Sequence, residues 1–293
     1  MRSATVDRVK AIGEGEAPGK VGNAERRLTR RFALPVCERP SALFRRRVGF
    51  YNDNMPNRTL TAVPVYNEVR HVAPVLAGAL AYSREVLVVD DGSTDGTAEL
   101  LTARDDIHLI RHPRNLGYGA ALKSAFGYAV ERGYDVLVTI DCDGQHQPRL
   151  IPRFVDACRA ADVVSGSRYL NRFPGDSLPP EDRRRINWII TDEVNRRLGL
   201  NLTDAFCGFK AYRVAALDGL RLDESGYAMP LEFWVRAVKR KLRIVELPVP
   251  LIYLDESRSF GGSLDQAATR LDVYREVLDR ALATVERCPC VCR

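Results

Sequence analysis

The chain has 293 residues, a formal net charge of +6 and 45% hydrophobic residues, which is enough apolar surface for one large domain or two small ones. This composition excludes collagen-like, low-complexity and wholly disordered proteins. Residues 1–54 hold 12 Lys and Arg against 6 Asp and Glu, so the whole charge excess lies there. The remaining chain is neutral, and we expect no nucleic acid partner because binding phosphates needs a concentrated basic face.

The division of the chain follows from this charge distribution. Residues 1–54 mix Gly, Pro, Ala and Arg without sustained periodicity, and we predict a disordered basic N-terminal extension. Residues 55–286 are expected to form one domain, and residues 287–293 a Cys-rich tail. The sequence contains neither an apolar run near the roughly 18 residues of a spanning helix nor the apolar block of a secretory signal, which predicts a cytoplasmic location.

Short β-branched runs alternate with helical patterns from Thr59 onward, which predicts an α/β fold with a mostly parallel sheet between helices. In the first half, strands are expected at 59–65, 85–89, 107–111, 136–140 and 162–165, and helices at 68–82, 95–103, 118–132 and 148–160. In the second half, we expect helices at about 186–199, 228–240 and 264–285, a strand at 208–213 and a strand pair within 243–253.

Acidic clusters follow two of these strands. Asp90-Asp91-Gly92-Ser93-Thr94-Asp95 comes directly after one strand, and Asp141-Cys142-Asp143-Gly144-Gln145-His146 comes after another. Ligands of open α/β sheets collect at the carboxyl ends of the strands, so both clusters are expected at one edge. Carboxylates held close together repel each other, and a divalent cation relieves the repulsion while leaving positions open for phosphates. A turn with a helix cap explains either cluster alone, but two at one edge favour a functional site.

The segment Asn115-Leu116-Gly117-Tyr118-Gly119-Ala120 is a weak candidate for a dinucleotide-binding turn. It lacks the third glycine and does not follow the first strand, so we reject a dehydrogenase. Its glycines are expected to let the backbone turn tightly into a helix packed beside the site.

Six spaced motifs now occur in order. They are Pro64-Val65-Tyr66-Asn67-Glu68, Asp90-Asp91-Gly92-Ser93-x-Asp95, Asn115-x-Gly117-x-Gly119, Asp141-x-Asp143-x-Gln145-His146-x-Pro148, Gly166-Ser167-Arg168 and Thr203-Asp204-x-x-Cys207-Gly208-Phe209. Together they resemble the family 2 glycosyltransferases of GT-A fold, most of all the dolichol or polyprenol phosphate mannosyl- and glucosyltransferase branch. The resemblance covers about residues 59–260.

This resemblance implies a donor site. Pro64, Tyr66 and Glu68 would bound the nucleotide pocket, and Asp90 would accept hydrogen bonds from the base or ribose of a nucleoside diphosphate sugar. Asp91 and Lys123 are further candidates for binding it. Asp141 and Asp143, aided by Gln145, would hold Mg or Mn against the diphosphate, where the metal neutralises charge on the departing group. The sequence leaves a GDP-mannose and a UDP-glucose type of donor open.

Catalytic candidates follow later strands and loops. Arg168 would grip a phosphate through paired N–H donors. Asp204 is the candidate base if the acceptor is a hydroxyl; a lipid phosphate needs no strong base, and Asp204 would then orient the nucleophile or help bind metal. Glu232 is expected to hydrogen-bond the sugar or a loop of the site.

The acceptor is expected to be a lipid phosphate at a membrane surface. Arg183, Arg184 and Arg185 precede the segment Ile186–Ile190, which could lie on a bilayer with Trp188 at the headgroups, so we expect a protein peripheral to the cytoplasmic face of a membrane. An ordinary helix with its apolar face inward explains this segment equally well.

The leading hypothesis is an inverting, metal-dependent hexosyltransferase that uses a polyprenyl phosphate acceptor. The same donor chemistry on a hydroxyl acceptor, and a nucleotide-sugar binding module without turnover, remain open alternatives.

Overall fold

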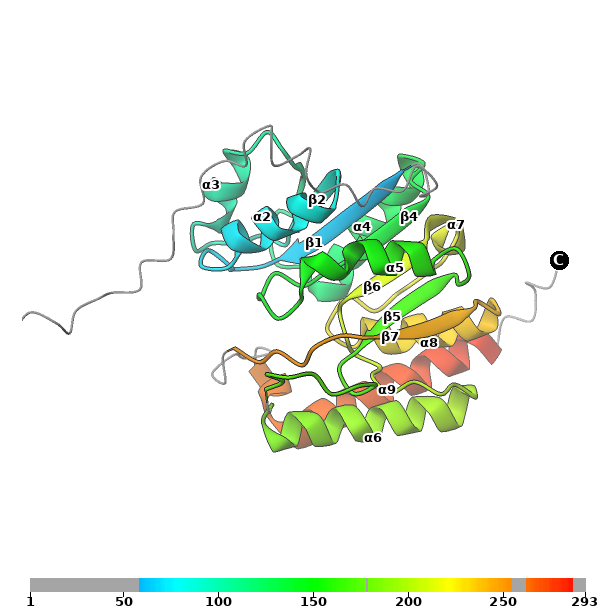
Figure 1. The fold of residues 1–293 in the computed structure, drawn as a ribbon. Helices are drawn as coiled ribbons and strands as arrows, with labels where there is room; N and C mark the ends of the chain where they lie inside the picture. The colour runs from blue at the N-terminus through cyan, green and yellow to red at the C-terminus, as the bar shows by residue number, and fades with distance from the viewer. Residues whose placement is uncertain (1–57, 178, 255–261, 287–293) are drawn as a thin grey trace, which may run out of the picture. The chain divides into compact units, whose positions relative to one another are not determined.

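The computed structural model describes residues 58–177, 179–254 and 262–286, so the predicted N-terminal extension and the Cys-rich tail lie outside the described residues. The described strands form one sheet in the order β3-β2-β1-β4-β6-β5-β7 (Figure 1). They are β1 (Thr59–Val65), β2 (Glu85–Asp90), β3 (His108–Arg111), β4 (Val136–Thr139), β5 (Val163–Ser167), β6 (Lys210–Arg213) and β7 (Ile244–Pro248). Strand β6 is antiparallel to both neighbours, and the other pairs are parallel, which confirms a mostly parallel sheet.

Helices cover both faces of the sheet (Figure 1). They are α2 (Val72–Tyr82), α3 (Thr97–Thr102), α4 (Tyr118–Glu131), α5 (Ile151–Ala157), α6 (Glu181–Leu198), α7 (Val214–Leu217), α8 (Met229–Lys239) and α9 (Ala267–Glu286), with 3-10 turns η1 (Pro148–Leu150) and η2 (Gly262–Asp265). Alternate residues of a strand point to opposite faces. In β2, accordingly, Leu87 packs with α4, α6, α8 and α9, whereas Val88 packs with α2 and α5.

The two differences from the sequence prediction that bear on the site lie in the second half of the domain. The strand pair expected within 243–253 is wrong: β7 alone forms there and pairs in parallel with β5, while residues 249–254 run on as irregular chain. Helix α6 begins at Glu181, before the basic run, because Glu181 and Asp182 favour the positive end of a helix and the arginines continue its first turns. The basic run is therefore part of the helix.

The topology brings several loops to one edge of the sheet. Strands β1, β2, β4 and β5 all end there, so the residues after Val65, Asp90, Thr139 and Ser167 meet at that edge. Because β6 runs in the opposite direction between β4 and β5, the segment that precedes it, rather than the one that follows it, reaches the same edge. The shared direction of the parallel strands thus brings these loops together, and the segment ahead of β6 adds residues 203–209.

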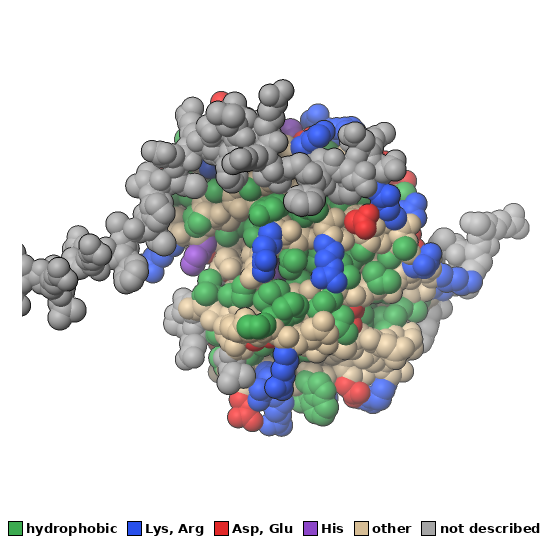
Figure 2. Space-filling model, viewed as in Figure 1, with side chains coloured by type: hydrophobic (Ala, Val, Ile, Leu, Met, Phe, Trp, Pro, Cys, Tyr) green, Lys and Arg blue, Asp and Glu red, His purple; other side chains and the backbone are tan. Residues whose placement is uncertain are grey.

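Charged side chains of both signs are spread over the face of the molecule in Figure 2, with apolar side chains between them. This mixture on the viewed face agrees with the balanced charge of residues 55–293. Cys142, Cys158 and Cys207 are free and buried, and the remaining cysteines lie outside the described residues.

Candidate functional site

A cavity of about 1050 Å³ lies at the carboxyl ends of the parallel strands. Eight residues predicted from the sequence line it, which are Pro64, Tyr66, Glu68, Asp91, Asp141, Asp143, Gln145 and Arg168. The structure therefore brings together loops that follow β1, β2, β4 and β5. Four other predicted residues, Asp90, Lys123, Asp204 and Glu232, are not among the lining residues.

Asp141 and Asp143 form the acidic part of the cavity. The Tyr118 hydroxyl donates a hydrogen bond to Asp141 Oδ1 at 3.0 Å, and the backbone N–H of Gln145 donates to Asp143 Oδ1 at 3.0 Å. Burial, and then the nearby charge of Asp141, raise the pKa of Asp143. The two carboxylates repel each other, so bound positive charge would stabilise this arrangement.

The donor set fits a hard divalent cation that is also coordinated by phosphate oxygens. Asp141 and Asp143 offer carboxylate oxygens, and Gln145 lines the same cavity. Within the described residues, no group of three or more His, Cys, Asp or Glu side chains is arranged to hold a metal alone. Two carboxylates leave coordination positions for a ligand, which suits a metal shared with a diphosphate better than a structural metal.

The His146 ring stabilises the loop that carries Asp141 and Asp143. Its Nδ1 accepts a hydrogen bond from the backbone N–H of Asp141 at 3.0 Å, and its Nε2 lies 3.8 Å from Asp141 Oδ2. Acceptance at Nδ1 places the proton of a neutral ring on Nε2, facing that carboxylate. The ring is almost fully buried and packs near Phe209, so His146 fixes the loop.

Gly208 lies directly against Asp141. A Cβ atom added at Gly208 would overlap both carboxylate oxygens of Asp141, so a glycine is required for this close approach. Gly208 lies just before β6, which pairs antiparallel with β4. The start of β6 therefore lies beside the loop that follows β4 and carries Asp141.

Substituting Gly208 by alanine is expected to lower kcat/KM by about a hundredfold, because displacing a reacting-site group by about 1 Å has effects of that size. Circular dichroism should show an intact fold. Gly127→Ala is the matched control, since nothing lies within 4 Å of a Cβ at that helical position. Equal activity of the two variants would contradict the assigned role of the Asp141 carboxylate.

The carboxylates of Asp90 and Asp91 both accept hydrogen bonds from backbone N–H groups of neighbouring loops. Asp91 accepts hydrogen bonds from the backbone N–H groups of Leu116 and Gly117, at 2.9 and 2.8 Å, and from the His112 ring at 2.6 Å. Asp90 is fully buried and its Oδ1 accepts from the backbone N–H of Ser93 at 2.9 Å. Asp91 thus ties the loop before α4 to the cavity, while Asp90 holds its own turn and pairs with Arg111, whose Nε lies 3.3 Å from Asp90 Oδ2.

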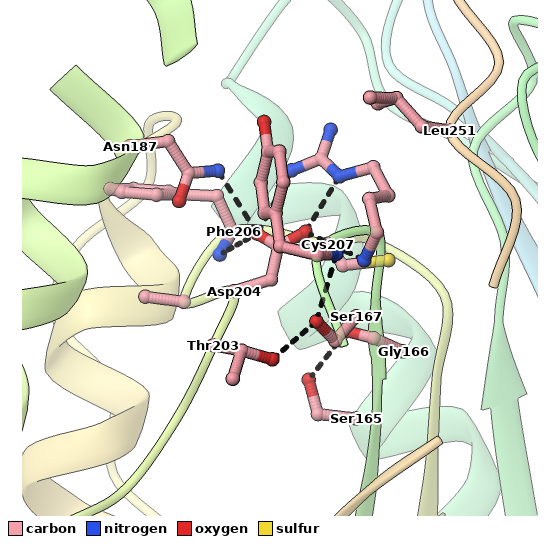
Figure 3. Close-up of polar contacts among 12 residues, drawn as sticks. Ser165, Gly166, Ser167, Asn187, Thr203, Asp204, Phe206, Cys207 and Leu251 are labelled. Carbon is pink, nitrogen blue, oxygen red and sulfur yellow. Dashed lines mark hydrogen bonds and ion pairs between the residues drawn. The ribbon is translucent and has the colours of Figure 1, made fainter. Parts of the chain in front are cut away.

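Asp204 lies at the centre of a buried polar cluster (Figure 3). Arg168 donates to it through Nε and NH2, at 2.6 and 2.9 Å, and Asn187 Nδ2 donates at 3.0 Å. Glu246 of β7 accepts hydrogen bonds from the backbone N–H groups of Thr203 and Asp204 and fixes the segment from the other side. The paired geometry is that of a guanidinium and a carboxylate held in a fork.

The charge state of Asp204 follows from this cluster. Burial alone would raise its pKa, but the positive charge of Arg168 and the hydrogen bonds from Arg168 and Asn187 lower the pKa to about 2. A carboxylate with so low a pKa is a weak proton acceptor at neutral pH. Asp204 is fully buried, whereas Arg168 is partly exposed and lines the cavity. The arrangement therefore presents the arginine to a ligand.

Lys123 and Glu232 form hydrogen bonds with a loop, residues 223–226, next to the cavity. Lys123 Nζ donates to the backbone oxygen of Asp223 at 3.2 Å and to Ser225 Oγ at 3.0 Å. Glu232 accepts from the backbone N–H groups of Asp223 and Glu224 at 2.9 and 2.8 Å. Their side chains hold the segment 223–226, and neither is among the residues that line the cavity. For Glu232, a hydrogen bond to a loop of the site was one of the two expected contacts.

Sequence reasoning missed several lining residues. Arg270 and Tyr274 come from α9, far along the chain, and Tyr118 and Tyr227 come from the start of α4 and the loop before α8. No local signal marks Arg270 or Tyr274, because both read as ordinary members of an amphipathic helix. Tyr118 stands inside the glycine motif, and that position was the available signal.

The end of the cavity near α6 and α9 is basic. Arg183 and Arg184 of α6 and the buried Arg270 of α9 line it, together with Arg168. The Trp188 side chain on the outer surface of α6 is 74% exposed. No helix in the described ranges is both long and apolar enough to span a bilayer.

Comparison with known proteins places this geometry in a family. Residues 61–221 match the sequence profile described as "Glycosyl transferase family 2". The chain belongs to this family. The enzyme is thus a glycosyltransferase, and the predicted GT-A type of α/β fold is confirmed.

Two relatives cover most of the domain. An undecaprenyl-phosphate mannosyltransferase of Micrococcus luteus is 38% identical over 228 residues, which are 73% of this chain and 92% of the relative. A polyprenol monophosphomannose synthase of Mycolicibacterium smegmatis is 34% identical over 246 residues, 78% of this chain and 91% of the relative. The resemblance to the polyprenol phosphate branch is confirmed by these relatives.

A solved structure shares the fold. Glucosyl-3-phosphoglycerate synthase from Mycobacterium tuberculosis, crystallised with Mn²⁺, UDP and phosphoglyceric acid, superposes with a TM-score of 0.58 at 18% identity, over 78% of each chain. The same protein has also been solved with Mg²⁺ and UDP.

Proposed function

We propose that this glycosyltransferase moves a hexose from a nucleoside diphosphate sugar to a polyprenyl phosphate, with inversion at the anomeric carbon. The observation that carries the proposal is one cavity with an acidic part, Asp141 and Asp143, and a basic part that includes Arg168, Arg183 and Arg184. An anionic donor held through a cation and an anionic acceptor held by arginines require those two parts. The two relatives named for polyprenyl phosphate mannosyl transfer support the same acceptor class.

Asp141, Asp143 and Gln145 would hold Mg or Mn. The ion, when bound, neutralises charge that develops on the leaving diphosphate. The acidic pair of this chain is supported for that task by the Tyr118 hydroxyl, the His146 ring and the space left by Gly208.

The acceptor phosphate supplies its own nucleophile. A phosphate oxygen forms the new bond to the anomeric carbon, and the bond from that carbon to the diphosphate oxygen breaks with its electron pair leaving on the diphosphate. A phosphate monoester is largely ionised near neutral pH, so no proton has to be removed. Asp204, with a pKa of about 2, is accordingly a positioning residue that holds Arg168, and its pairing disfavours the alternative with a hydroxyl acceptor.

Glu68 and Tyr66 bound the donor side of the cavity in this proposal. The relatives named for mannosyl transfer make a GDP-mannose type of donor the first choice over a UDP-glucose type. Trp188, which is exposed beside the exposed Arg184 and Arg185, supports a peripheral enzyme whose α6 faces anionic headgroups on the cytoplasmic side of a membrane.

The direct experiment incubates the purified protein with radiolabelled GDP-mannose or UDP-glucose, Mn²⁺ and a short polyprenyl phosphate. We expect label in the organic phase with one donor, and loss of that label when the acceptor lacks its phosphate. Label confined to an aqueous product would establish a hydroxyl acceptor. Donor binding without any transfer would establish a binding module.

A further inference from the structure

The segment 223–226 is fixed from two helices at once. Lys123 of α4 donates to Asp223 and Ser225, and Glu232 of α8 accepts from the backbone N–H groups of Asp223 and Glu224. Arg236 donates to the Glu232 carboxylate at 3.0 Å and orients it. Such a buried, satisfied network gives a loop one conformation.

Two more contacts hold the same segment. Arg280 of α9 pairs with Glu224 at 2.6 Å, and Glu224 Oε1 accepts from the backbone N–H groups of Ser225 and Gly226. The start of α4 approaches so closely that the backbone N–H of Ala120 donates to the Ser225 oxygen at 3.0 Å. A Cβ at Gly117 would overlap that oxygen, and one at Gly119 would lie 2.7 Å from Met229 Cβ. The expected tight turn of the glycine motif is confirmed here.

All of these contacts determine the position of the next residue, Tyr227. Its ring stacks on Tyr118 with centroids 5.6 Å apart and an angle of 13° between the planes. Tyr118 in turn donates to Asp141 Oδ1. Tyr227 lines the cavity and is 40% exposed. Because Tyr227 stacks on Tyr118, which is bonded to Asp141, the ring lies near the acidic part of the cavity. Burial, followed by the charges of Asp141, Asp91 and Asp143, raises the pKa of Tyr227.

A ring in this place suits one part of the donor. The carboxylates of Asp141 and Asp143 face the diphosphate in the proposed function, and Tyr66 and Glu68 lie at the loop after β1, on the nucleoside side. The group bonded to the far end of the diphosphate is the hexose. A pyranose has an apolar C–H face and a polar rim, and an aromatic face beside polar side chains complements both.

We propose that the Tyr118–Tyr227 stack is the platform for the transferred sugar, with the ring of Tyr227, which lines the cavity, against the C–H face of the hexose. The inference rests on the proposed function and adds a sugar-binding residue to it. Tyr118 links the platform to Asp141, so the sugar and the diphosphate are positioned by one connected unit. Lys123 and Glu232 are positioning residues for the platform.

Calorimetry can separate the sugar from the nucleotide. The dissociation constants of GDP and GDP-mannose, and of UDP and UDP-glucose, are measured with Mn²⁺ and without acceptor, for the wild type, Tyr227→Ala and Tyr227→Phe. We expect Tyr227→Ala to weaken binding of the nucleotide sugar about tenfold, which corresponds to about 1.4 kcal/mol, and to change binding of the free diphosphate less than twofold. Tyr227→Phe should bind both ligands as the wild type does.

Leu100→Ala, an exposed apolar residue of α3 that does not line the cavity, is the matched control. Equal weakening of both ligands, or no change in either, would overturn the platform while leaving the proposed function intact. A wild type that binds neither nucleotide nor nucleotide sugar would refute the proposed function itself.

A second variant tests the positioning network. Lys123→Met removes the donor to Asp223 and Ser225, and we expect the same selective loss for the nucleotide sugar, smaller than that of Tyr227→Ala. Because both changes act through one ring, the double variant should lose less than the two single losses combined. Full additivity would show that Lys123 does not act through Tyr227.

Discussion

Replacing Asp204 by alanine is expected to lower the free energy of unfolding by about 3 kcal/mol. The substitution leaves the guanidinium of Arg168, whose side chain is 24% exposed, without the carboxylate that it faces in a fork. Breaking a buried ion pair by removing one partner has effects of about 3–5 kcal/mol, and the partial exposure of Arg168 places this case at the lower end. Urea unfolding of both proteins measures the difference.

Asp192→Ala is the matched control, because Asp192 forms an ion pair with Arg196 in which both side chains are more than half exposed. We expect that variant to differ from the wild type by less than about 1 kcal/mol. Equal stability of Asp204→Ala and the wild type would show that the pair contributes nothing in the folded protein.

The contribution of the Asp204–Arg168 pair to stability should depend on pH in the acid range. The pKa of Asp204 is about 2 in the folded protein and 3.8 in the unfolded chain, so the folded state binds this proton more weakly. The stabilisation is therefore complete above about pH 4 and is lost as the pH falls toward 2. The stability difference between the wild type and Asp204→Asn should shrink over that interval, and a difference that grows there would have the wrong sign for an ionised Asp204.

Asp143→Asn is expected to lower kcat/KM about a thousandfold, which is the upper range for removing one preorganised electrostatic group from a reaction site. The change keeps the size of the side chain and removes one of two repelling carboxylates. Unfolding of the metal-free protein should therefore show equal or higher stability than the wild type. Steady-state transfer assays and urea unfolding check the two parts.

Stabilisation by Mn²⁺ distinguishes a role in metal binding from a role in folding. Melting temperatures of the wild type should rise with Mn²⁺ and nucleoside diphosphate, and those of Asp143→Asn should not. Asp156→Asn, at an exposed position on α5, should behave as the wild type does. Loss of transfer with an undiminished response to Mn²⁺ would refute the assignment of Asp143 as a metal ligand.

The positions of most strands along the chain and the convergence of the acidic loops were predictable from local patterns. Strand β1 has the predicted bounds, and the segments after β2 and β4 meet as parallel topology requires. The hydrophobic run of each strand and the polar residues at its end were enough to predict where the acidic loops meet. Both signals lie within a few residues of each other in the sequence.

The direction in which a side chain points was not predictable in the same way. Asp204 was expected at the reaction centre, yet its carboxylate is buried against Arg168 and Asn187, which are 36 and 17 residues away in the sequence. A loop position indicates which edge of the sheet a residue reaches, but the partner that turns it inward comes from tertiary packing. Arg270 reaches the cavity only because α9 packs on α6 and α8, a contact without a local sequence signal.

The reversed strand β6 divides most of the cavity lining into two stretches of sequence, apart from Tyr227, which stacks on Tyr118 of the first stretch. Loops from residues 64–146 form the half assigned to the donor, whereas residues after β5, the segment ahead of β6, and helices α6 and α9 form the other. A mutation in one stretch can therefore change one part of the cavity without changing the sequence of the other. Chimeras joined within β4 or β5 are consequently a rational way to exchange acceptor recognition among relatives while the nucleotide preference is inherited unchanged.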